Sequence, residues 1–567
     1  MQDAITALQD GNPRQPPRLS ALTDARLARD PQSTAFIENG RAITHAQFHE
    51  QVLRSTTWLQ QHGVRRGHRV AIWMVNRVEW LALYFALGRL GAAAVAVNTR
   101  YRSEEVGYLL AHSQAHRLIL QQDCRGTDFG AILARIDPSQ LHTLQEIGVI
   151  DAPADLPATL AAIPCAPFDP WRCDPAAGPD TSRPDDLSIL YSTSGTTKGP
   201  KLVMHPQRTI AGHAMALAGF YRLDAPDARL LAALPFCGTF GMSGVLAAYA
   251  GGAPACIMDV FDAEAAAGLL RAESITHAFG SDEMYRRILE RVPQADPFPR
   301  ARLFGFGAFN SSISDFASQA CERGVPLTGL YGSSEVQALV SAQSMDLPIA
   351  LRIQGGGMLA VAPADVRIRD LQTGLPAPAG VSGEIEIRTP YAFTGYYNDP
   401  DATAQVLLPD GYFRTGDAGH LREDGSFVYE SRLGDAIRIG GFLVNPQEIE
   451  DVLKRAPGVA DAQVVAVDID GQPRPVAFVI ARPGHKADAD ALIEAARASI
   501  ASFKVPARVW FVDEYPVTSS ANGVKTQRNR LRDMAGALLA APPAAFTPGN
   551  AVPAAPSTPR PRESGHR

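Results

Sequence analysis

The stretch LYSTSGTTKGPK, residues 190–201, is the most informative part of this chain. Three apolar residues at 189–191 end a predicted strand, and hydroxyl side chains, glycine and lysine follow them. Glycine permits a tight turn, hydroxyls and backbone N–H groups donate hydrogen bonds, and lysine adds positive charge, so the loop suits a phosphate group. A plain surface turn remains an alternative, because Ser, Thr and Gly are common in turns. The spacing is not that of the Walker loop.

The loop resembles the signature of the adenylate-forming enzymes, the superfamily of acyl-CoA synthetases, peptide-synthetase adenylation domains and luciferases, whose pattern is close to TSGTTGxPKG. The match covers residues 193–197, Pro200 and Lys201, whereas Lys198 and Leu202 stand where glycine is usual. The resemblance implies that the loop binds the phosphates of ATP, with Lys201 among the catalytic residues. The ATP-binding residues that it implies here are Thr193, Ser194, Gly195, Thr196 and Thr197.

Length and composition indicate a globular protein of more than one domain. A chain of 567 residues exceeds one compact domain, and 46% hydrophobic with 20% charged residues is typical of soluble globular proteins. The net charge of -6 gives no reason to expect nucleic acid or an anionic membrane as a partner. The six cysteines form no CxxC pair, so neither a zinc site nor a disulfide framework is indicated. Scattered cysteines of this kind are best explained as reduced thiols in a cytoplasmic protein.

The sequence indicates no membrane or secretion segment. Residues 1–17 lack both a basic start and an apolar core, so they are not expected to be a signal peptide. The most apolar stretch, residues 81–97, contains Arg89 and is better explained as a helix followed by a strand than as a transmembrane segment.

Helical and strand patterns alternate over about residues 19–120. The elements predicted are a helix at 44–61, a strand at 69–74, a helix at 79–90 and a strand at 92–97. This alternation predicts a parallel sheet covered by helices. Residues 152–184, rich in Pro, Ala and Asp, are expected to form an irregular connector.

The resemblance implies an α/β protein with a large multi-subdomain N-terminal domain, built from parallel sheets and a small barrel, and a small mobile α+β C-terminal domain. The expected parts are a loose leader at 1–18, an AMP-binding (adenylation) domain at 19–434, a lid domain at 435–540 that carries the catalytic lysine, and a disordered tail at 541–567. The C-terminal elements predicted are helices at 446–455 and 489–500, strands near Val464 and Val476, and a strand at 508–512.

Three further motifs resemble nucleotide-binding segments of the same superfamily. They are LFGFGAFN at 303–310, LYGSSE at 330–335, which is similar to YGxTE, and the long stretch 411–450. The nucleotide-binding residues that the resemblance implies are Gly307, Ala308, Phe309, Tyr331, Gly332, Ser333, Ser334, Asp417 and Arg432. An aromatic face such as that of Tyr331 suits adenine, and the Asp417 carboxylate could accept hydrogen bonds from the ribose hydroxyls.

Other residues of these motifs have implied roles beyond the nucleoside. Glu335 is expected to hold Mg2+, a hard cation that prefers carboxylate and phosphate oxygens, although taken alone it would be a solvated charge at a helix start. Asp435 is expected at the hinge of the small domain, next to Gly434, which replaces the usual charged residue. Gly440 and Gly441 are expected to bring a strand against CoA, the alternative being an ordinary bulge.

A strand predicted at 230–235 leads into the segment FCGTFG at 236–241. The resemblance implies an acyl pocket, and its expected lining residues are Phe236, Gly238 and Phe240. The alternative is a plain strand-to-helix turn. The apolar side chains favour an apolar acyl group, and they do not decide between a fatty chain and an aryl or ring acid. Asp282, further along, is predicted to cap the helix that follows it.

The stretch PVTSSANGVKTQRNRLR, residues 516–532, is similar to the family's final motif, PxTxxGKIxxxxLR. Val524 adds one residue between the glycine and the lysine, and counting back from the final Leu-Arg places the motif's lysine at Lys525. The resemblance implies that Lys525 is the catalytic lysine. A basic cluster near a C-terminus is otherwise usually a solvated face.

Together these motifs cover residues 19–535 and imply an ATP-dependent acyl-CoA ligase. ATP, Mg2+ and CoA are the expected cofactors and co-substrates, and the expected partner is a small-molecule carboxylic acid, fatty or aryl. Lys525 would bridge the α-phosphate and the substrate carboxylate. Two alternatives are an enzyme that loads a carrier protein and a non-catalytic nucleotide-binding regulator. The oligomeric state, a homodimer included, is left open.

Overall fold

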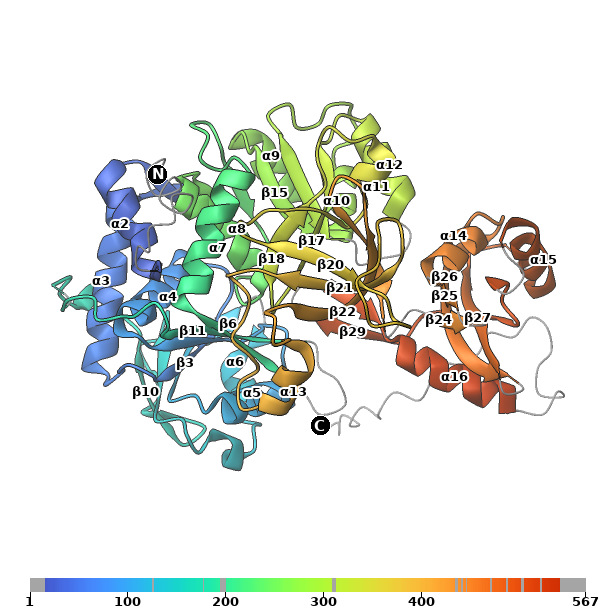
Figure 1. Cartoon of the computed structure of the whole chain (residues 1–567). Helices are drawn as coiled ribbons and strands as arrows, with labels where there is room; N and C mark the ends of the chain where they lie inside the picture. Colours follow the sequence, from blue (N-terminus) through green and yellow to red (C-terminus); the bar gives the residue numbers. More distant parts are fainter. Residues whose placement is uncertain are drawn as a thin grey trace.

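The computed structural model describes residues 16–540, apart from 125–126, 177, 194–199, 308–312, 434–436, 440–441, 445, 470–471, 486–487, 501–503 and 521–522. A large N-terminal α/β domain is followed by a small C-terminal α+β domain (Figure 1). The mixed α/β class predicted from the sequence is confirmed.

The larger of the two main sheets has 13 strands. In spatial order they are β2 (Arg41–Thr44), β1 (Thr34–Glu38), β14 (Ala255–Ile257), β13 (Leu230–Ala232), β15 (His277–Ser281), β16 (Leu303–Gly307), β17 (Leu327–Ser333), β18 (Gln337–Ala342), β19 (Gly356–Leu359), β23 (Phe427–Arg432), β22 (Phe413–Leu421), β21 (Gly383–Arg388) and β20 (Asp365–Arg369). Strands β1 to β17 of this order are parallel, and the pairs beyond β17 are antiparallel. Within the described residues the order is open at β20, so the small barrel stays a prediction.

The second sheet has 8 strands. In spatial order they are β12 (Leu202–Pro206), β11 (Leu187–Ser192), β4 (Ala93–Ala96), β3 (Arg69–Trp73), β5 (Arg117–Gln121), β8 (Glu146–Ile150), β10 (Ile163–Pro167) and β9 (Thr159–Leu160). Its strands from β11 to β10 are parallel, as the alternating pattern predicts, and β12 and β9 add antiparallel edges. A separate two-stranded ribbon consists of β6 (Asp123–Cys124) and β7 (Thr127–Asp128).

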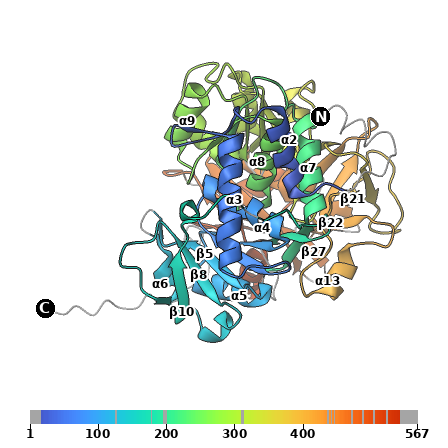
Figure 2. The same ribbon diagram turned by 90° about the vertical axis from the view of Figure 1, so that its left-hand side faces the viewer.

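Helices cover the faces of both sheets. Those of the large domain are α2 (Leu19–Arg29), α3 (His45–Gln61), α4 (Val78–Leu90), α5 (Ser103–Ser113), α6 (Phe129–Leu133), α7 (Gln207–Phe220), α8 (Thr239–Gly251), α9 (Ala263–Ala272), α10 (Asp282–Glu290), α11 (Ile313–Glu322), α12 (Ile349–Arg352) and α13 (Pro400–Val406). Figure 2 shows α3, α4, α7 and α8 in the middle of the domain. Helix α8 is buried on every side, as expected of a helix that is apolar all round, and one core joins it to side chains of both sheets.

The N-terminal prediction is confirmed closely because local signals agree there with the fold. Thr44 caps α3: its side chain accepts a hydrogen bond from the Gln47 N–H, and its own N–H donates to Gln47 Oε1 at 2.9 Å. Reciprocal capping of this kind fixes where a helix begins. The observed bounds of α3, β3, α4 and β4 agree with the predicted elements to within one residue at each end.

The prediction of an irregular connector at 152–184 is wrong in part. It contains β9, β10 and a short 3-10 helix, Pro170–Arg172. Pro164 and Pro167 make the segment resemble a loop, but β10 lies near the sheet's edge, beyond which only the two-residue β9 follows. Proline is tolerated at such edges because it interrupts few ladder hydrogen bonds.

The small domain has cores of its own. Its main sheet consists of β26 (Val459–Ile469), β27 (Gln472–Ala481) and β28 (Val509–Phe511), and two hairpins consist of β24 (Ile437–Ile439) with β25 (Phe442–Val444) and β29 (Val517–Ser520) with β30 (Gly523–Thr526). Helices α14 (Pro446–Lys454) and α15 (Ala489–Ser499) pack with Val464 on one side of β26, and α16 (Arg528–Ala540) packs with Val465 on the other. Successive strand residues face opposite sides, so β26 contributes to both cores.

The predicted helices and strands of this part are confirmed. The domain boundaries stay predictions, because residues 434–436, like the predicted tail and most of the leader, lie outside the described residues. In the described part of the chain, no helix is both long and apolar enough to cross a membrane.

Candidate active site

The predicted phosphate loop connects two antiparallel strands. Ser192 at the end of β11 pairs with Leu202 at the start of β12, and the Thr193 N–H donates to the Lys201 carbonyl at 3.0 Å. Because β11 is parallel to β4, the loop leaves the carboxyl edge of the sheet, where ligands bind in open α/β folds. Its other predicted phosphate-binding residues, Ser194, Gly195, Thr196 and Thr197, lie outside the described residues.

Two predicted catalytic residues meet at one tyrosine. The Tyr396 hydroxyl donates to Glu335 Oε1 at 2.9 Å, and Lys201 Nζ lies 4.6 Å from the centre of the Tyr396 ring. Burial raises the pKa of Tyr396, and the neighbouring Glu335 carboxylate raises it further, so the hydroxyl stays protonated and can only donate to that carboxylate. Lys201 and Glu335 therefore both contact Tyr396, and no direct ion pair between them is found among the described residues.

A second cluster contains three predicted nucleotide-binding residues. The Tyr331 hydroxyl donates to Asp417 Oδ2 at 2.5 Å, and Arg432 Nε lies 3.0 Å from Asp417 Oδ1. Asp417 on β22 and Arg432 on β23 are directly paired across the strands. Asp417 is 3% exposed, whereas the Arg432 side chain is 53% exposed, so the guanidinium remains accessible to a ligand. The Asp417 charge raises the pKa of Arg432.

The segment 331–335, which contains the last three residues of β17 and the first two of the turn to β18, connects these two clusters. Gly332 lets backbones approach closely, because a Cβ there would stand 2.6 Å from Ala338 Cα. The Ser333 hydroxyl accepts a hydrogen bond from the Glu335 N–H at 3.2 Å. The Ser334 carbonyl accepts one from His205 Nε2 at 2.7 Å; burial lowers the pKa of His205 to about 4, so the imidazole is neutral near pH 7. The turn is thus tied to β12, which begins at the phosphate loop.

The three residues predicted to line an acyl pocket surround the start of α8. Gly238 is the N-cap of that helix, while Phe240 is buried within it. Phe236 is 1% exposed, and its ring packs edge-on near Trp80. The backbone N–H of Phe236 donates to Asn76 Oδ1 at 2.8 Å. These contacts are those of a buried strand-to-helix turn, and the acyl-pocket role stays a prediction.

The predicted helix cap at Asp282 is wrong. Ser281 is the N-cap of α10, where its hydroxyl accepts a hydrogen bond from the Met284 N–H at 3.2 Å. Asp282 is instead the first helical residue, and its carboxylate accepts from the Glu283 N–H at 2.8 Å. Serine and aspartate are both favoured N-cap residues, so the sequence alone did not decide which of these two neighbouring residues caps the helix.

The remaining predicted site residues are described only in part. Gly307 ends β16, and Lys525 lies in β30 opposite Thr518, with its side chain outside the description. The predicted residues wholly outside the described set are Ala308, Phe309, Asp435, Gly440 and Gly441. Their roles stay predictions.

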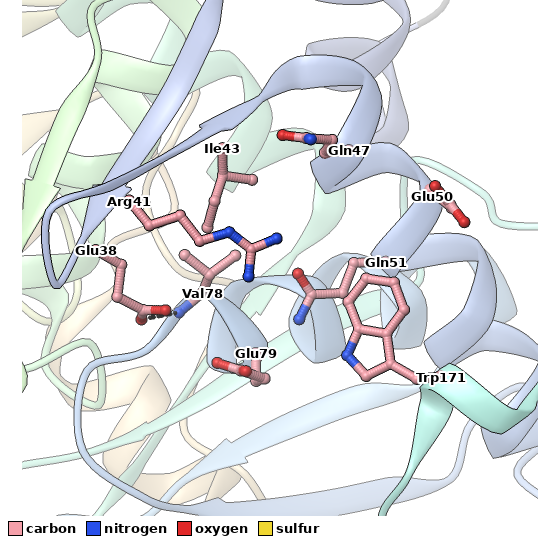
Figure 3. A pocket seen from close by; sticks show the side chains of 9 residues that line it. All are labelled: Glu38, Arg41, Ile43, Gln47, Glu50, Gln51, Val78, Glu79 and Trp171. Atoms are coloured by element: carbon pink, nitrogen blue, oxygen red, sulfur yellow. Dashed lines mark hydrogen bonds between the residues drawn. The ribbon is translucent and has the colours of Figure 1, made fainter.

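Two pockets in the described part of the chain lie elsewhere. One of about 420 Å3 opens between β1, β2 and the helices α3 and α4, with Glu38, Arg41 and Trp171 in its lining (Figure 3). The other, of about 230 Å3, adjoins it at Glu38. Neither is lined by a predicted site residue. Three of the first pocket's polar side chains have other partners: Glu38 accepts the Val78 N–H, and Glu50 and Glu79 pair with arginines.

Among the residues that sequence reasoning missed are Tyr396, His205 and Thr239. Thr239 donates a hydrogen bond to the Ser334 hydroxyl at 3.3 Å, and His205 and Tyr396 hold the turn as described above. The only sequence signal for Tyr396 was its place after Gly395 in a stretch rich in aromatic residues.

Two protein-family models match the chain. The model of the AMP-binding enzyme matches residues 23–397, and that of the AMP-binding enzyme C-terminal domain matches residues 448–522. The chain therefore belongs to the AMP-binding enzymes, the adenylate-forming superfamily that its motifs resemble.

Relatives span nearly the whole chain. A 3-[(3aS,4S,7aS)-7a-methyl-1,5-dioxo-octahydro-1H-inden-4-yl]propanoyl:CoA ligase of Rhodococcus jostii (strain RHA1) is 30% identical over 524 residues, which cover 90% of this chain and 97% of that protein. A feruloyl-CoA synthase of Amycolatopsis sp is 30% identical over 515 residues, covering 89% and 97%. The crystal structure of ATP-bound MatB from Rhodopseudomonas palustris has the same fold, with a TM-score of 0.76 at 24% identity, covering 91% of this chain and 99% of that one.

Proposed function

We propose that this protein is an ATP-dependent acyl-CoA ligase for a fatty, aryl or ring-bearing carboxylic acid. The observation that carries the proposal is the arrangement around the segment 331–335. At one end, Tyr331 contacts the Asp417–Arg432 pair; at the other, Glu335 lies beside Lys201 through Tyr396. Groups suited to a ribose and groups suited to phosphates therefore stand at the two ends of one short segment, as binding of ATP requires.

The residues present fit Mg2+ at Glu335. The carboxylate is half-buried, and only its Oε1 has a hydrogen-bond partner among the described residues, which leaves Oε2 for a ligand. Mg2+ is commonly held by one or two carboxylates together with substrate phosphates. When bound, the ion would supply positive charge to the phosphates. Lys201 would add a second positive charge at the end of the phosphate loop.

The reaction proceeds in two steps, which displace pyrophosphate and then AMP. First, a carboxylate oxygen of the acid attacks the α-phosphorus of ATP; an O–P bond forms, the bond to the β-phosphate breaks, and pyrophosphate leaves. Then the CoA sulfur attacks the acyl carbon; a C–S bond forms, AMP leaves with the electron pair of the C–O bond, and the thiol proton is lost to solvent. The first step brings two anions together, so cations aimed at the developing charge carry the catalysis.

The residues of this chain have distinct tasks in that scheme. Arg432 and Asp417 would orient the ribose, and Lys525 would bridge the α-phosphate and the substrate carboxylate. Gly440 and Gly441 would admit the CoA arm, with Asp435 as the hinge between the two steps. The names of the two relatives, one acting on a ring-bearing propanoic acid and one on ferulic acid, support a ring or aryl acid.

The test is ATP–pyrophosphate exchange with the full chain, Mg2+ and a panel of fatty, hydroxycinnamic and ring-bearing propanoic acids. Exchange with one class of acid is expected, followed on addition of CoA by a thioester detected by mass spectrometry. Exchange without a thioester would indicate a carrier-loading enzyme instead. Tight binding of ATP with no exchange for any acid would overturn the proposal in favour of a nucleotide-binding regulator.

A further inference from the structure

Residues 393–397 connect the phosphate loop's return strand to Glu335. The backbone hydrogen bonds run from Met204 N–H to Gly395 O at 3.0 Å, from Thr394 N–H to Met204 O at 3.0 Å, from Tyr397 N–H to Leu202 O at 2.8 Å, and from Phe393 N–H to Glu335 O at 2.7 Å. The segment thus lies along β12 like an added strand, and its first residue holds the Glu335 backbone. Sequence-distant parts of the phosphate site are fixed relative to one another by this segment.

Tyr396 is the residue of that segment whose side chain enters the site. It is 7% exposed, and its ring packs against Phe393 with centroids 5.1 Å apart. Its N–H donates to Thr403 Oγ1 at 2.9 Å, and Gly395 before it has φ +138, where a Cβ would stand 2.9 Å from Thr403 Cγ2. The orientation of the ring is therefore set by its packing against Phe393 and by the fixed backbone of residues 395–396.

The ring and the hydroxyl of Tyr396 contact opposite charges. The ring face attracts the Lys201 ammonium, 4.6 Å from its centre, and the hydroxyl donates to the Glu335 carboxylate at 2.9 Å. A lysine and a glutamate that both contact one tyrosine could otherwise form an ion pair, in which each neutralises the other. Among the described residues no such pair joins Lys201 and Glu335, and each contacts Tyr396 instead.

We propose that Tyr396 is a positioning residue for the magnesium–triphosphate complex: it keeps Lys201 and Glu335 apart and aims both at the phosphates. This inference rests on the proposed function, because it assumes that the loop and Glu335 receive ATP. Without the hydroxyl, the Glu335 carboxylate is free to rotate toward Lys201, and the metal must then compete with that lysine. Without the ring, Lys201 also loses its own support.

Two variants and a matched control test the role of Tyr396. Tyr396→Phe removes only the hydroxyl, and Tyr396→Leu removes the ring as well. Tyr397→Phe is the control, because the neighbouring tyrosine donates its hydroxyl to Gln114 at 3.2 Å, away from Glu335. Calorimetry measures ATP binding to the full chain with and without Mg2+, and pyrophosphate exchange is followed across Mg2+ concentrations. Thermal unfolding verifies that each variant folds.

The expected result is a split between metal dependence and maximal rate. In Tyr396→Phe the Mg2+ concentration for half-maximal exchange rises about tenfold, as is usual when a partner of a metal ligand is lost, and saturating Mg2+ restores the rate. Tyr396→Leu binds ATP more weakly even without Mg2+, since Lys201 is no longer held. A merely structural role would lower stability and rate without changing the Mg2+ dependence.

The outcomes separate this inference from the proposed function. Unchanged Mg2+ dependence in Tyr396→Phe, with an active wild type, would overturn the role of Tyr396 alone. A wild type without exchange would overturn the proposed ligation, and the calorimetric difference between ATP with and without Mg2+ would still decide the role of Tyr396. Equal effects in Tyr396→Phe and Tyr397→Phe would also overturn it.

Discussion

The two parts of the predicted active site are held in different ways. In the large domain, Glu335, Lys201, Asp417 and Arg432 each contact a second side chain of the site, and all lie on or beside strands of the two large sheets. In the small domain, Lys525 lies on a two-stranded hairpin. Isolated two-stranded hairpins are marginally stable. The nucleotide-binding side chains are therefore fixed before a ligand binds. Lys525, in contrast, lies on an element whose stability depends on contacts at the hairpin's base, the end where its two strands join the rest of the small domain.

At that base a buried carboxyl group contacts an arginine. Directly after the hairpin, the Gln527 N–H donates to the Pro516 carbonyl at 2.7 Å. The next residue, Arg528, lies 2.7 Å from Glu450 Oε1, and Glu450, which is 0% exposed on its side chain, also accepts the Val464 N–H at 2.8 Å. In the view of Figure 1, the hairpin stands at the end of α16 nearer to the large domain. Hinge-type movement of the small domain would then carry Lys525 as part of a defined unit.

Removing the hairpin's cation should have the largest effect. We expect Lys525→Ala to lower ATP–pyrophosphate exchange on the order of 100-fold or more, because a charge aimed at the transition state is lost. The KM for ATP should change little, since the large domain holds the nucleotide. Arg474→Ala, which removes an exposed cation from β27, is the control. A Lys525→Ala enzyme with the wild-type rate would show that the hairpin has no catalytic task.

A change in the fixed cluster should act on binding instead. Asp417→Asn keeps an acceptor for the Tyr331 hydroxyl but removes the charge that pairs with Arg432. We expect the KM for ATP to rise about tenfold with a smaller change in kcat, because a hydrogen bond to a charged group is lost in both ground and transition states.

Asp424→Asn is the matched control for this change. Asp424 lies between the same two strands, where it accepts the Ser426 N–H at 2.9 Å, outside the cluster. If Asp417→Asn lowered kcat while leaving the KM for ATP unaltered, the contrast between a binding cluster and a catalytic hairpin would fail.

The sequence predicted the elements and the motif residues better than it predicted their contacts. Helix α3 and strand β3 follow from a capping box and an apolar run, which are local signals. The role of Tyr396 is not local. Its place after Gly395 does not indicate a partner, and only the pairing of residues 394–397 with β12 sends one ring to Glu335 and the other away. The Glu450–Arg528 pair joins residues 78 positions apart, so no window of sequence indicated it.

The smallest expected effect concerns the stability of the hairpin's base. Burial raises the pKa of Glu450 from the ordinary 4.5 to about 7, against the opposing influence of Arg528. Between these two pH values the unfolded carboxyl is ionised while the folded one holds its proton. The free energy of unfolding should therefore fall as pH rises from about 4.5 to 7, by at most about 1.4 kcal/mol per pH unit, and should not change further above 7 from this group.

Glu450→Gln isolates that contribution, because glutamine is neutral at every pH and keeps an oxygen for the Val464 N–H and Arg528. Hydrogen exchange of the β26 and β27 amides, compared between variant and wild type at each pH, should show the wild type losing protection relative to the variant as pH rises through this window. Glu494→Gln, at an exposed glutamate on α15, should show no such trend. A wild type that gains protection over this range would mean that Arg528 keeps Glu450 ionised, and the base would then be a rigid ion pair at every working pH.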